Sequence, residues 1–169
     1  MSVTDRMNHP QGQNELLLYR LYRIHVTAGP AIARMCEREH GITRREWRVL
    51  SFLADVEGVL SSELAEVVML DRARTSRALT RLVEKNLVRR EPKPSDRREV
   101  HVFLTEEGRR VYRALFPRIV AIQHELLAPF SVAQRAQFSE LLDLLQAQTL
   151  RINPGGEGPL PMEAGADDA

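Results

Sequence analysis

Basic side chains recur at helical spacing near the middle of the chain. Four of them follow one another at intervals of three, four and four residues: Arg74, Arg77, Arg81 and Lys85. Residues three and four positions apart share one face of an α-helix, so these cations form a stripe, to which Arg72 adds another. Like charges on one stripe repel each other, which favours a polyanionic partner. A merely solvated charged face is the alternative, but such a face more often mixes the two signs.

Short hydroxyl side chains accompany these cations at the start of the same segment. Thr75 and Ser76 stand beside the arginines, and hydroxyls of this kind donate hydrogen bonds to phosphates or to base edges. Our candidates for contacts to DNA bases and neighbouring phosphates are Arg74, Thr75, Ser76 and Arg77. The candidates for the DNA backbone are Arg81 and Lys85, with Arg72 as a further cation of the first turn.

A basic, turn-rich loop follows between two predicted strands. The strands are L-V-R-R-E and V-H-V-F-L-T, and the loop P-K-P-S-D-R-R-E carries Lys93, Arg97 and Arg98. A stiff hairpin that ends in arginines fits a minor groove, where negative potential is concentrated. We expect Arg97 in that groove and Arg98 on the DNA backbone. Asp96 is expected to hold one of these arginines by a charge-assisted hydrogen bond.

The segments before this hairpin predict a helix-turn-helix. S-S-E-L-A-E-V-V begins with serines that suit a helix N-cap, and its apolar residues share one face. Asp71 is the predicted cap of the basic helix, and Asn86, which tolerates a left-handed conformation, is its predicted end. The residues expected in the core are Leu64, Ala65, Val68, Leu79, Leu82 and Val83. A helix-turn-helix followed by a hairpin is a winged helix-turn-helix, whose main known use is reading duplex DNA.

Apolar helices are predicted on both sides of this region. Their apolar stripes are Leu17, Leu21, Ile24, Ala28, Ile32 and Met35, then Val111, Leu115, Ile119, Ile122 and Leu126, then Phe138, Leu141, Leu142 and Leu145. Gly29 and Pro30 should kink or split the first helix. Capping boxes are predicted at Thr43 with Glu46 and at Ser131 with Gln134. Because a small winged domain cannot cover so much apolar surface, we expect these helices to cover each other in a homodimer.

Three sequence motifs resemble the MarR family of bacterial transcriptional regulators. They are L-A-E in the first motif helix, D-R-A-R-T-S-R-A-L-T-R-L-V-E-K-N-L-V through the basic helix, and D-R-R-E-V-H-V-F-L-T-E-E-G-R through the hairpin into the next helix. The chain departs from the family at two places, with Met69 in the turn and Asn86 after the basic helix where many relatives have glycine.

This resemblance implies a mainly α fold with a small β-hairpin wing. It implies one domain over 1–152, with dimerisation helices at 15–40 and 106–152 and the DNA-binding region at 43–105. The function it implies is a homodimeric repressor on a double-stranded DNA operator, released by a small aromatic or phenolic acid. Two recognition helices related by a dyad predict a pseudo-palindromic operator with half-sites about 34 Å apart. No cofactor is expected.

Charge is distributed unevenly along the 169 residues. The net charge of the chain is only +1, but 72–101 holds ten basic residues against four acidic ones. This concentration is the electrostatic footprint of a phosphate-binding surface. The segment 153–169, rich in Gly, Pro and acid, is predicted to be a disordered tail. No apolar run approaches the roughly 20 residues that span a bilayer, and the N-terminus lacks a signal-peptide core, so we expect a cytoplasmic protein without a membrane partner.

A second group of residues suits a small aromatic acid. Aromatic rings for stacking and cations for a carboxylate are offered by Tyr19, Tyr22, Arg23, His25, Trp47 and Arg48. The family resemblance implies an effector pocket of this kind between the dimer helices and the winged region. Each residue also has a plain structural interpretation, since Trp47 at helical spacing suits a core and His25 suits a surface or interface.

Other functions remain as alternatives at this point. Cys36 is the sole cysteine, and nearby arginines favour its thiolate, which would suit redox sensing, although it has no resolving partner in the chain. The five histidines show no short zinc-site spacing. The familiar motifs of phosphate loops, hydrolases and metalloproteases are absent, so an enzyme is not expected. A winged helix that binds protein instead of DNA is the remaining alternative.

Overall fold

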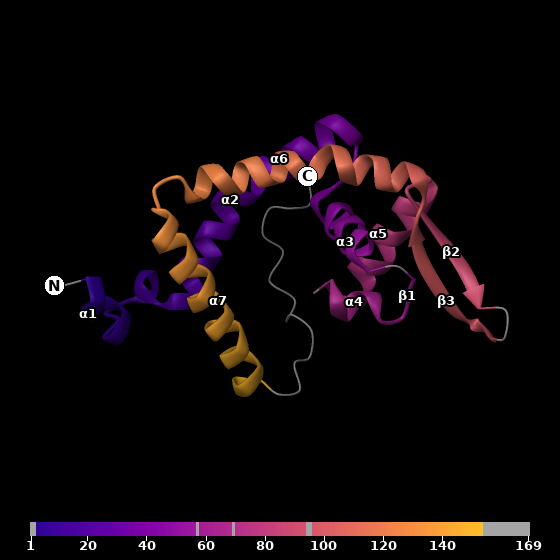
Figure 1. Cartoon of the computed structure of the whole chain (residues 1–169). Helices are drawn as coiled ribbons and strands as arrows, with labels where there is room; N and C mark the ends of the chain where they lie inside the picture. The colour runs from indigo at the N-terminus through magenta and orange to yellow at the C-terminus, as the bar shows by residue number, and fades with distance from the viewer. Residues whose placement is uncertain (1–2, 57, 69, 94–95, 154–169) are drawn as a thin grey trace. The chain divides into compact units, whose positions relative to one another are not determined.

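The computed structural model describes residues 3–56, 58–68, 70–93 and 96–153, with the side chains of 3–5 and 96–98 outside that description. The described residues form two compact units, which are divided between Arg44 and Arg45. Figure 1 shows the helices and strands of both units. The predicted tail lies outside the described residues except for Asn153, and so does Met69. Both of these predictions stay untested.

The first unit is helical. Its elements are α1 (Val3–Asn8), a 3₁₀ turn η1 (Gln13–Glu15) and α2 (Leu17–His40). Helix α2 continues through Pro30, so it does not split there, and the alternative of a kink stays a prediction. Proline removes one backbone donor, but the helix has several turns on either side to hold it together. Gly41, with φ of 60°, ends α2, and its N–H donates to the Glu37 carbonyl at 2.9 Å.

Most of the predicted stripe on α2 is half-buried. Ile24 differs, since 61% of its surface is exposed in the single chain. Leu18 and Val26 are also exposed on this helix. Part of the apolar surface of α2 is therefore left uncovered within one copy of the protein.

The core of the second unit is formed by three helices and the start of a fourth, together with the inner side of the sheet. The elements that pack here are α3 (Arg44–Asp55), α4 (Leu64–Val67), α5 (Arg72–Glu84) and α6 (Glu106–Leu127). Fully or almost fully buried side chains include Leu50, Leu53, Leu64, Leu79, Leu82, Val111 and Leu115. Of the predicted core residues only Val83 is wrong, with 36% of its surface exposed. Leu79 and Leu82 already define the buried face of α5, and Val83 lies beyond its edge.

A three-stranded antiparallel sheet completes the winged region. Its strands are β1 (Val59–Leu60), β2 (Val88–Lys93) and β3 (Asp96–Leu104), in the order β1-β3-β2. Strand β1 pairs through Val59 with Val102. No pattern in the sequence predicted this strand. The hairpin strands are also longer than predicted, because β3 already begins at Asp96 in the segment expected to be loop. Val102 and Leu104 are buried, so the face of β3 that carries them packs on the core.

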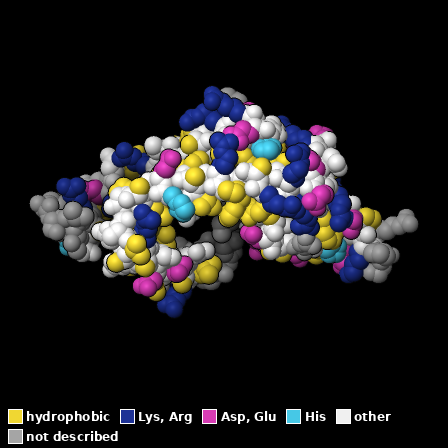
Figure 2. Space-filling model, turned by 45° about the horizontal axis from the view of Figure 1, so that its top comes forward, with side chains coloured by type: hydrophobic (Ala, Val, Ile, Leu, Met, Phe, Trp, Pro, Cys, Tyr) yellow, Lys and Arg dark blue, Asp and Glu magenta, His cyan; other side chains and the backbone are white. Residues whose placement is uncertain are grey.

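The C-terminal helices are long and largely exposed. Helix α6 is followed by α7 (Val132–Ile152), and the Ser131–Gln134 capping box is confirmed at the start of α7. Helix α7 has no buried residue, although Phe138, Leu141 and Leu142 lie on it. Exposed hydrophobic side chains stand among charged ones on the face shown in Figure 2. Within the described residues, no helix has the length and apolar character needed to cross a membrane.

Candidate nucleic-acid interface

The basic helix α5 starts at a well-formed cap. Asp71 Oδ1 accepts a hydrogen bond from the Arg74 backbone N–H at 2.8 Å, which confirms the predicted N-cap. The same carboxylate binds the Arg74 side chain, with 3.1 Å between Oδ2 and Nε. Arg74 is thus committed in part to the cap of its own helix. This geometry fixes where α5 begins after the preceding turn.

Helix α5 has one polar, solvent-exposed face. Its members are Arg72, Ala73, Ser76, Arg77, Thr80, Arg81 and, in the last turn, Glu84. The opposite face is buried and includes Thr75, Ala78, Leu79 and Leu82. Arg77 and Arg81 of the predicted stripe lie on this face, together with Arg72. Arg74 is half-buried, and Lys85 lies beyond the end of α5. Thr80 belongs to this face and was missed.

Ion pairing divides the basic residues of this region into two groups. One group is bound to carboxylates of the protein: Arg74 to Asp71, Lys85 to Glu46, Arg89 to Glu91, and Lys93 to Glu99. The other group is exposed and has no ion pair with any residue that the structure describes: Arg72, Arg77, Arg81 and Arg90. Cations of the second group keep their full charge available for an external anion.

Two predicted DNA-contacting residues have structural partners. Thr75 is only 3% exposed, and its hydroxyl donates to the Asp71 carbonyl at 2.9 Å, so it is not presented to DNA as expected. Lys85 lies just beyond α5, and its Nζ binds Glu46 Oε2 at 2.7 Å. The Glu46 side chain is 1% exposed, and a buried carboxylate requires such a partner. Lys85 therefore ties the end of α5 to α3, and its predicted place on the DNA backbone stays a prediction.

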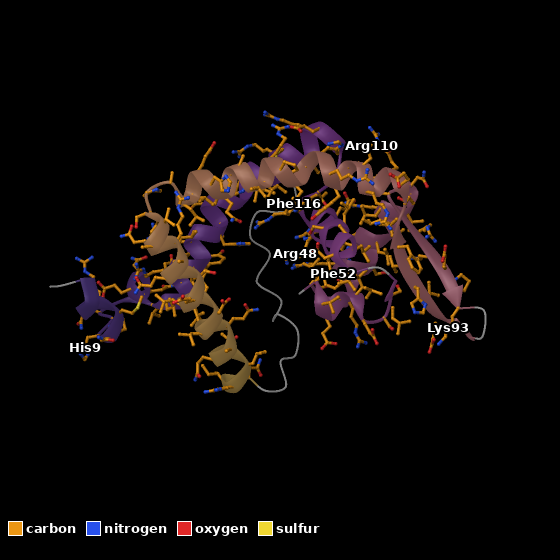
Figure 3. All side chains as sticks on the ribbon, in the orientation of Figure 1. His9, Arg48, Phe52, Lys93, Arg110 and Phe116 are labelled. Carbon is orange, nitrogen blue, oxygen red and sulfur yellow. The ribbon has the colours of Figure 1, made fainter. Side chains whose placement is uncertain are left out.

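The wing carries its cations on two faces of strand β2. Arg89 lies over the Phe103 ring, 4.7 Å from its centroid, and also pairs with Glu91. Lys93 lies at the far end of the hairpin (Figure 3) and binds Glu99 at 2.5 Å. Asp96, Arg97 and Arg98 belong to β3, and their side chains lie outside the described residues. The predicted minor-groove role of Arg97, and the roles of its two neighbours, stay predictions.

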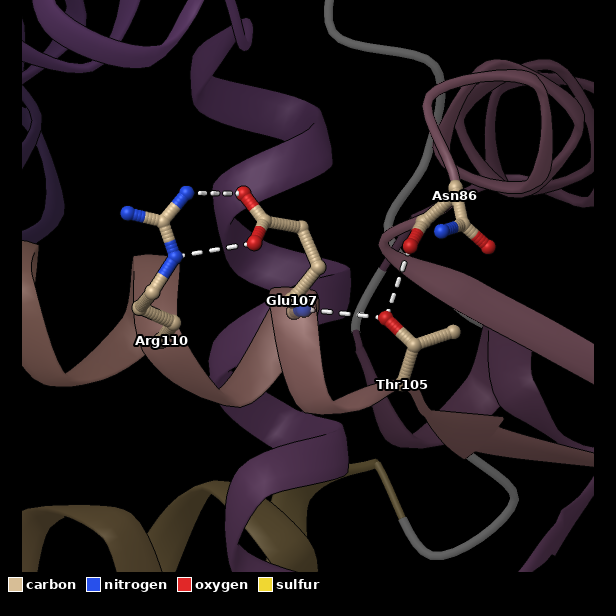
Figure 4. Close-up of polar contacts among 5 residues, drawn as sticks. Asn86, Thr105, Glu107 and Arg110 are labelled. Carbon is tan, nitrogen blue, oxygen red and sulfur yellow. Dashed lines mark hydrogen bonds and ion pairs between the residues drawn. The ribbon is translucent and has the colours of Figure 1, made fainter.

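The base of the wing is fixed by the turn after α5 and the cap of α6. Asn86 has φ of 56°, which confirms its predicted left-handed conformation. Thr105 Oγ1 donates to the Asn86 carbonyl at 2.7 Å and accepts from the Gly108 N–H at 3.0 Å (Figure 4). One hydroxyl thus joins the turn after α5, the end of β3 and the start of α6. Nearby, a hydrogen bond to Glu107 raises the pKa of Arg110.

The aromatic residues predicted on α2 lie in the first unit. The Tyr19 and Tyr22 ring centroids are 6.3 Å apart. Arg23 is exposed. The Arg44 guanidinium donates to the His25 ring, with 2.9 Å between Nη2 and Nε2. The role of these residues in binding an effector stays a prediction.

A continuous aromatic stack lies in the second unit. Trp47 on α3 is buried and stacks on Tyr112 of α6, with centroids 5.7 Å apart and an angle of 11° between the rings. Tyr112 in turn stacks on Phe116 at 5.2 Å, and Phe116 is 45% exposed. Burial, with a smaller contribution from Asp55, raises the pKa of Tyr112. Arg48 is half-buried on α3, and Figure 3 marks it together with Phe116.

The chemistry of Cys36 is that of a buried thiol. Its surface is wholly inaccessible, and burial raises its pKa to about 11. Because the thiolate is the reactive form, burial and the raised pKa disfavour the redox reactivity of Cys36, and redox sensing stays an untested alternative. Within the described part of the chain, no cluster of three or more His, Cys, Asp and Glu residues could hold a metal ion.

Comparison with known proteins decides the family. A MarR family model matches residues 40–99. Transcriptional regulator HosA from Escherichia coli O111:H- is 30% identical over 101 residues, which cover 60% of this chain and 75% of HosA. The chain belongs to the MarR family. As a MarR-family protein it is a transcriptional regulator, and its relatives are regulators and not enzymes.

Two further MarR-family relatives have informative names. The Homoprotocatechuate degradative operon repressor of Escherichia coli is 26% identical over 106 residues, covering 63% of this chain and 72% of that protein. The solved structure of the PcaV transcriptional regulator from Streptomyces coelicolor, in complex with its natural ligand, is similar with a TM-score of 0.64. It is 27% identical and covers 87% of this chain and 98% of that one.

Several residues of this MarR-family regulator escaped the sequence analysis. Arg90 was assigned only to a predicted strand, because strand alternation did not say which face meets α5. Tyr112 and Phe116 were missed because their helix was assigned an apolar line that excluded them. Their spacing of four residues, on one face of a helix, was the available signal.

Proposed function

We propose that the protein is a homodimeric repressor that binds a pseudo-palindromic DNA operator and leaves it when a small aromatic acid binds. The observation that supports DNA binding is the exposed face of α5, where Arg72, Arg77 and Arg81 have no carboxylate partner among the described residues. In this proposal α5 enters the major groove. Arg77 contacts base edges, Ser76 contacts a base or a neighbouring phosphate, and Arg81 contacts the backbone.

The wing and the terminal helices complete this proposal. Arg97 reaches into the minor groove beside the recognition helix, with Arg98 on the backbone. Helices α6 and α7 pair with those of a second copy, because Leu126, Phe138 and Leu141 expose apolar surface that a single chain leaves in water. A two-fold axis between the copies then sets the operator half-sites about one helical turn apart.

The proposed effector is an aromatic or phenolic acid. Stacking surface is supplied by Trp47, Tyr112 and the exposed edge of Phe116, while Arg48 is a cation on the same helix as Trp47. The names of the homoprotocatechuate operon repressor and of PcaV with its natural ligand support a small ligand in the family. Saturable quenching of Trp47 fluorescence by an aromatic acid, with weaker operator binding, is the expected result. Absence of both effects would refute this part.

Matched substitutions test the DNA-binding face. Arg77→Ala should weaken operator binding by about 1–3 kcal/mol and relax the sequence preference. Arg113→Ala is the control, because Arg113 is equally charged and exposed but lies on α6 and pairs with Glu106 at 3.1 Å. Fluorescence anisotropy on the same labelled operator measures both. Equal losses for the two variants would show a general charge effect and contradict the assignment of α5.

A further inference from the structure

A cavity of about 230 Å³ lies at the junction of α5, the segment before α4, and the wing. Its polar lining comes from all three: Arg72 and Ser76 from α5, Ser61 and Ser62 from the segment before α4, and Arg90 from β2. Ala65 and Leu79 are its apolar lining. We call it the Arg72/Arg90 pocket. Two cations and three hydroxyls around one space are a donor set for an oxyanion.

The charged side chains that line the Arg72/Arg90 pocket are both cations. Neither arginine forms an ion pair with a residue that the structure describes, and no described acidic residue lines the cavity. Four acids adjoin the lining residues in the sequence. Asp71 is engaged by the backbone and side chain of Arg74, and Glu91 pairs with Arg89. Glu63 and Glu66 are exposed and do not line the cavity. Thr75 also lines the pocket, but its hydroxyl already donates to the Asp71 carbonyl. The pocket therefore holds positive charge that the protein itself does not neutralise.

Ser61 and Ser62 do not have the capping role that the sequence predicted for them. Sequence patterns predicted Ser61 and Ser62 as N-caps of α4, but that helix begins at Leu64 without a side-chain cap. The Ser61 N–H donates to the Val100 carbonyl at 2.8 Å, which fixes this segment to the edge of the sheet. Ser62 and Ser76 are exposed. Their hydroxyls are thus accessible to a ligand from solvent.

The position of the pocket selects the kind of anion. Ser76 lies on the exposed face of α5 and is followed directly by Arg77, the proposed base-contacting residue. A DNA strand bordering the groove that α5 occupies would pass over this pocket with its phosphates facing the protein. We propose that the Arg72/Arg90 pocket binds one backbone phosphate of the operator and so fixes the recognition helix and the wing to the same strand. This inference rests on the proposed function.

Substitution of Arg90 can distinguish a specific phosphate contact in the pocket from a general attraction between a basic surface and DNA. Neighbouring side chains of a strand point to opposite faces, and Arg89, one residue earlier, is bound to Glu91 and Phe103. Arg89→Gln and Arg90→Gln therefore remove the same charge from adjacent positions, one in the pocket and one outside it. A phosphate contact carries no base information, so its loss should weaken specific and non-specific binding alike.

The test compares these two variants with the wild-type protein on operator and on unrelated duplex DNA across a salt series. Arg90→Gln should lose about tenfold in affinity on both DNAs, as expected for a charge-assisted hydrogen bond, and its salt slope should fall by about one. Arg89→Gln should stay within about twofold of the wild type. Equal behaviour of the two variants would overturn the inference.

Neutral methylphosphonate linkages, placed one at a time along the operator, identify the phosphate itself. One position should weaken binding of the wild type but not of Arg90→Gln. If no position behaves so, and inorganic phosphate instead raises the melting temperature of the wild type but not of Arg90→Gln, the pocket binds a free anion and the inference is wrong. Loss of operator binding in Arg77→Ala with none in Arg90→Gln would overturn the pocket and leave the proposed function standing.

Discussion

The ion pair between Glu46 and Lys85 should make a measurable contribution to stability. The two charged atoms are 2.7 Å apart, and two unit charges at this distance attract by about 6 kcal/mol at an effective dielectric constant of about 20. Desolvation of the carboxylate opposes this attraction. Breaking a fully buried pair costs about 3–5 kcal/mol. Because the Lys85 side chain is 35% exposed, water screens part of the interaction, and we expect about 2–3 kcal/mol for Lys85→Met.

Urea unfolding at neutral pH and fixed protein concentration measures this loss. Methionine keeps the aliphatic packing of the lysine stem and removes only the charge. With a slope of about 2–3 kcal/mol per molar urea, the midpoint should fall by roughly 1 M without a change in slope. The double variant Glu46→Met with Lys85→Met is the control, and it should recover most of the loss because no carboxylate remains buried there.

Two results would refute this reasoning. A change of less than about 0.5 kcal/mol in Lys85→Met would place the residue among ordinary surface positions. A salt slope of operator binding that falls by about one in Lys85→Met would show that Lys85 meets a phosphate. The structural role predicts an unchanged slope at temperatures where the variant is folded.

Two further predictions concern the buried thiol of Cys36 and the exposed apolar side chains of α7. The Cys36 pKa is raised from 9.0 to about 11 by burial, so the stability it contributes is fully present below pH 9 and is lost as pH rises to 11. Between pH 9 and pH 11 the wild type should lose up to about 2–3 kcal/mol more stability than Cys36→Ala. Denaturant unfolding of both proteins at each pH measures the difference. Equal losses in the two proteins would contradict the argument from burial. Leu142 is an exposed apolar residue of α7, so Leu142→Glu should shift the protein toward monomer in sedimentation experiments. The control Glu140→Gln should not. An unchanged dimer in Leu142→Glu would show that α7 is not part of the interface.

Local signals in the sequence predicted the parts of the fold that depend on neighbouring residues. Asp71 caps α5 through a bond to an N–H three residues on, and Ser131 with Gln134 does the same for α7. Such caps span a single turn, so residue type and spacing suffice to find them. Asn86 was predictable for the same reason, because few residues adopt a left-handed conformation easily.

Contacts between distant segments could not be predicted in this way. Lys85 and Glu46 are 39 positions apart, and nothing in their spacing indicates that they bind each other. Strand β1 was missed because two residues are too short for a periodic signal. Thr75 is a different case, since it lies four residues before buried Leu79 and helical periodicity already placed it on the inner face.

The most direct test of the central claim is a titration of the wild-type protein against DNA from around its own coding region. Anisotropy is followed across a salt series, with and without an excess of unrelated duplex. Saturable binding that survives the competitor, with a steep loss of affinity as salt rises, is the predicted result. Binding that the competitor abolishes at every salt concentration, on all fragments from that region, would contradict sequence-specific recognition by α5.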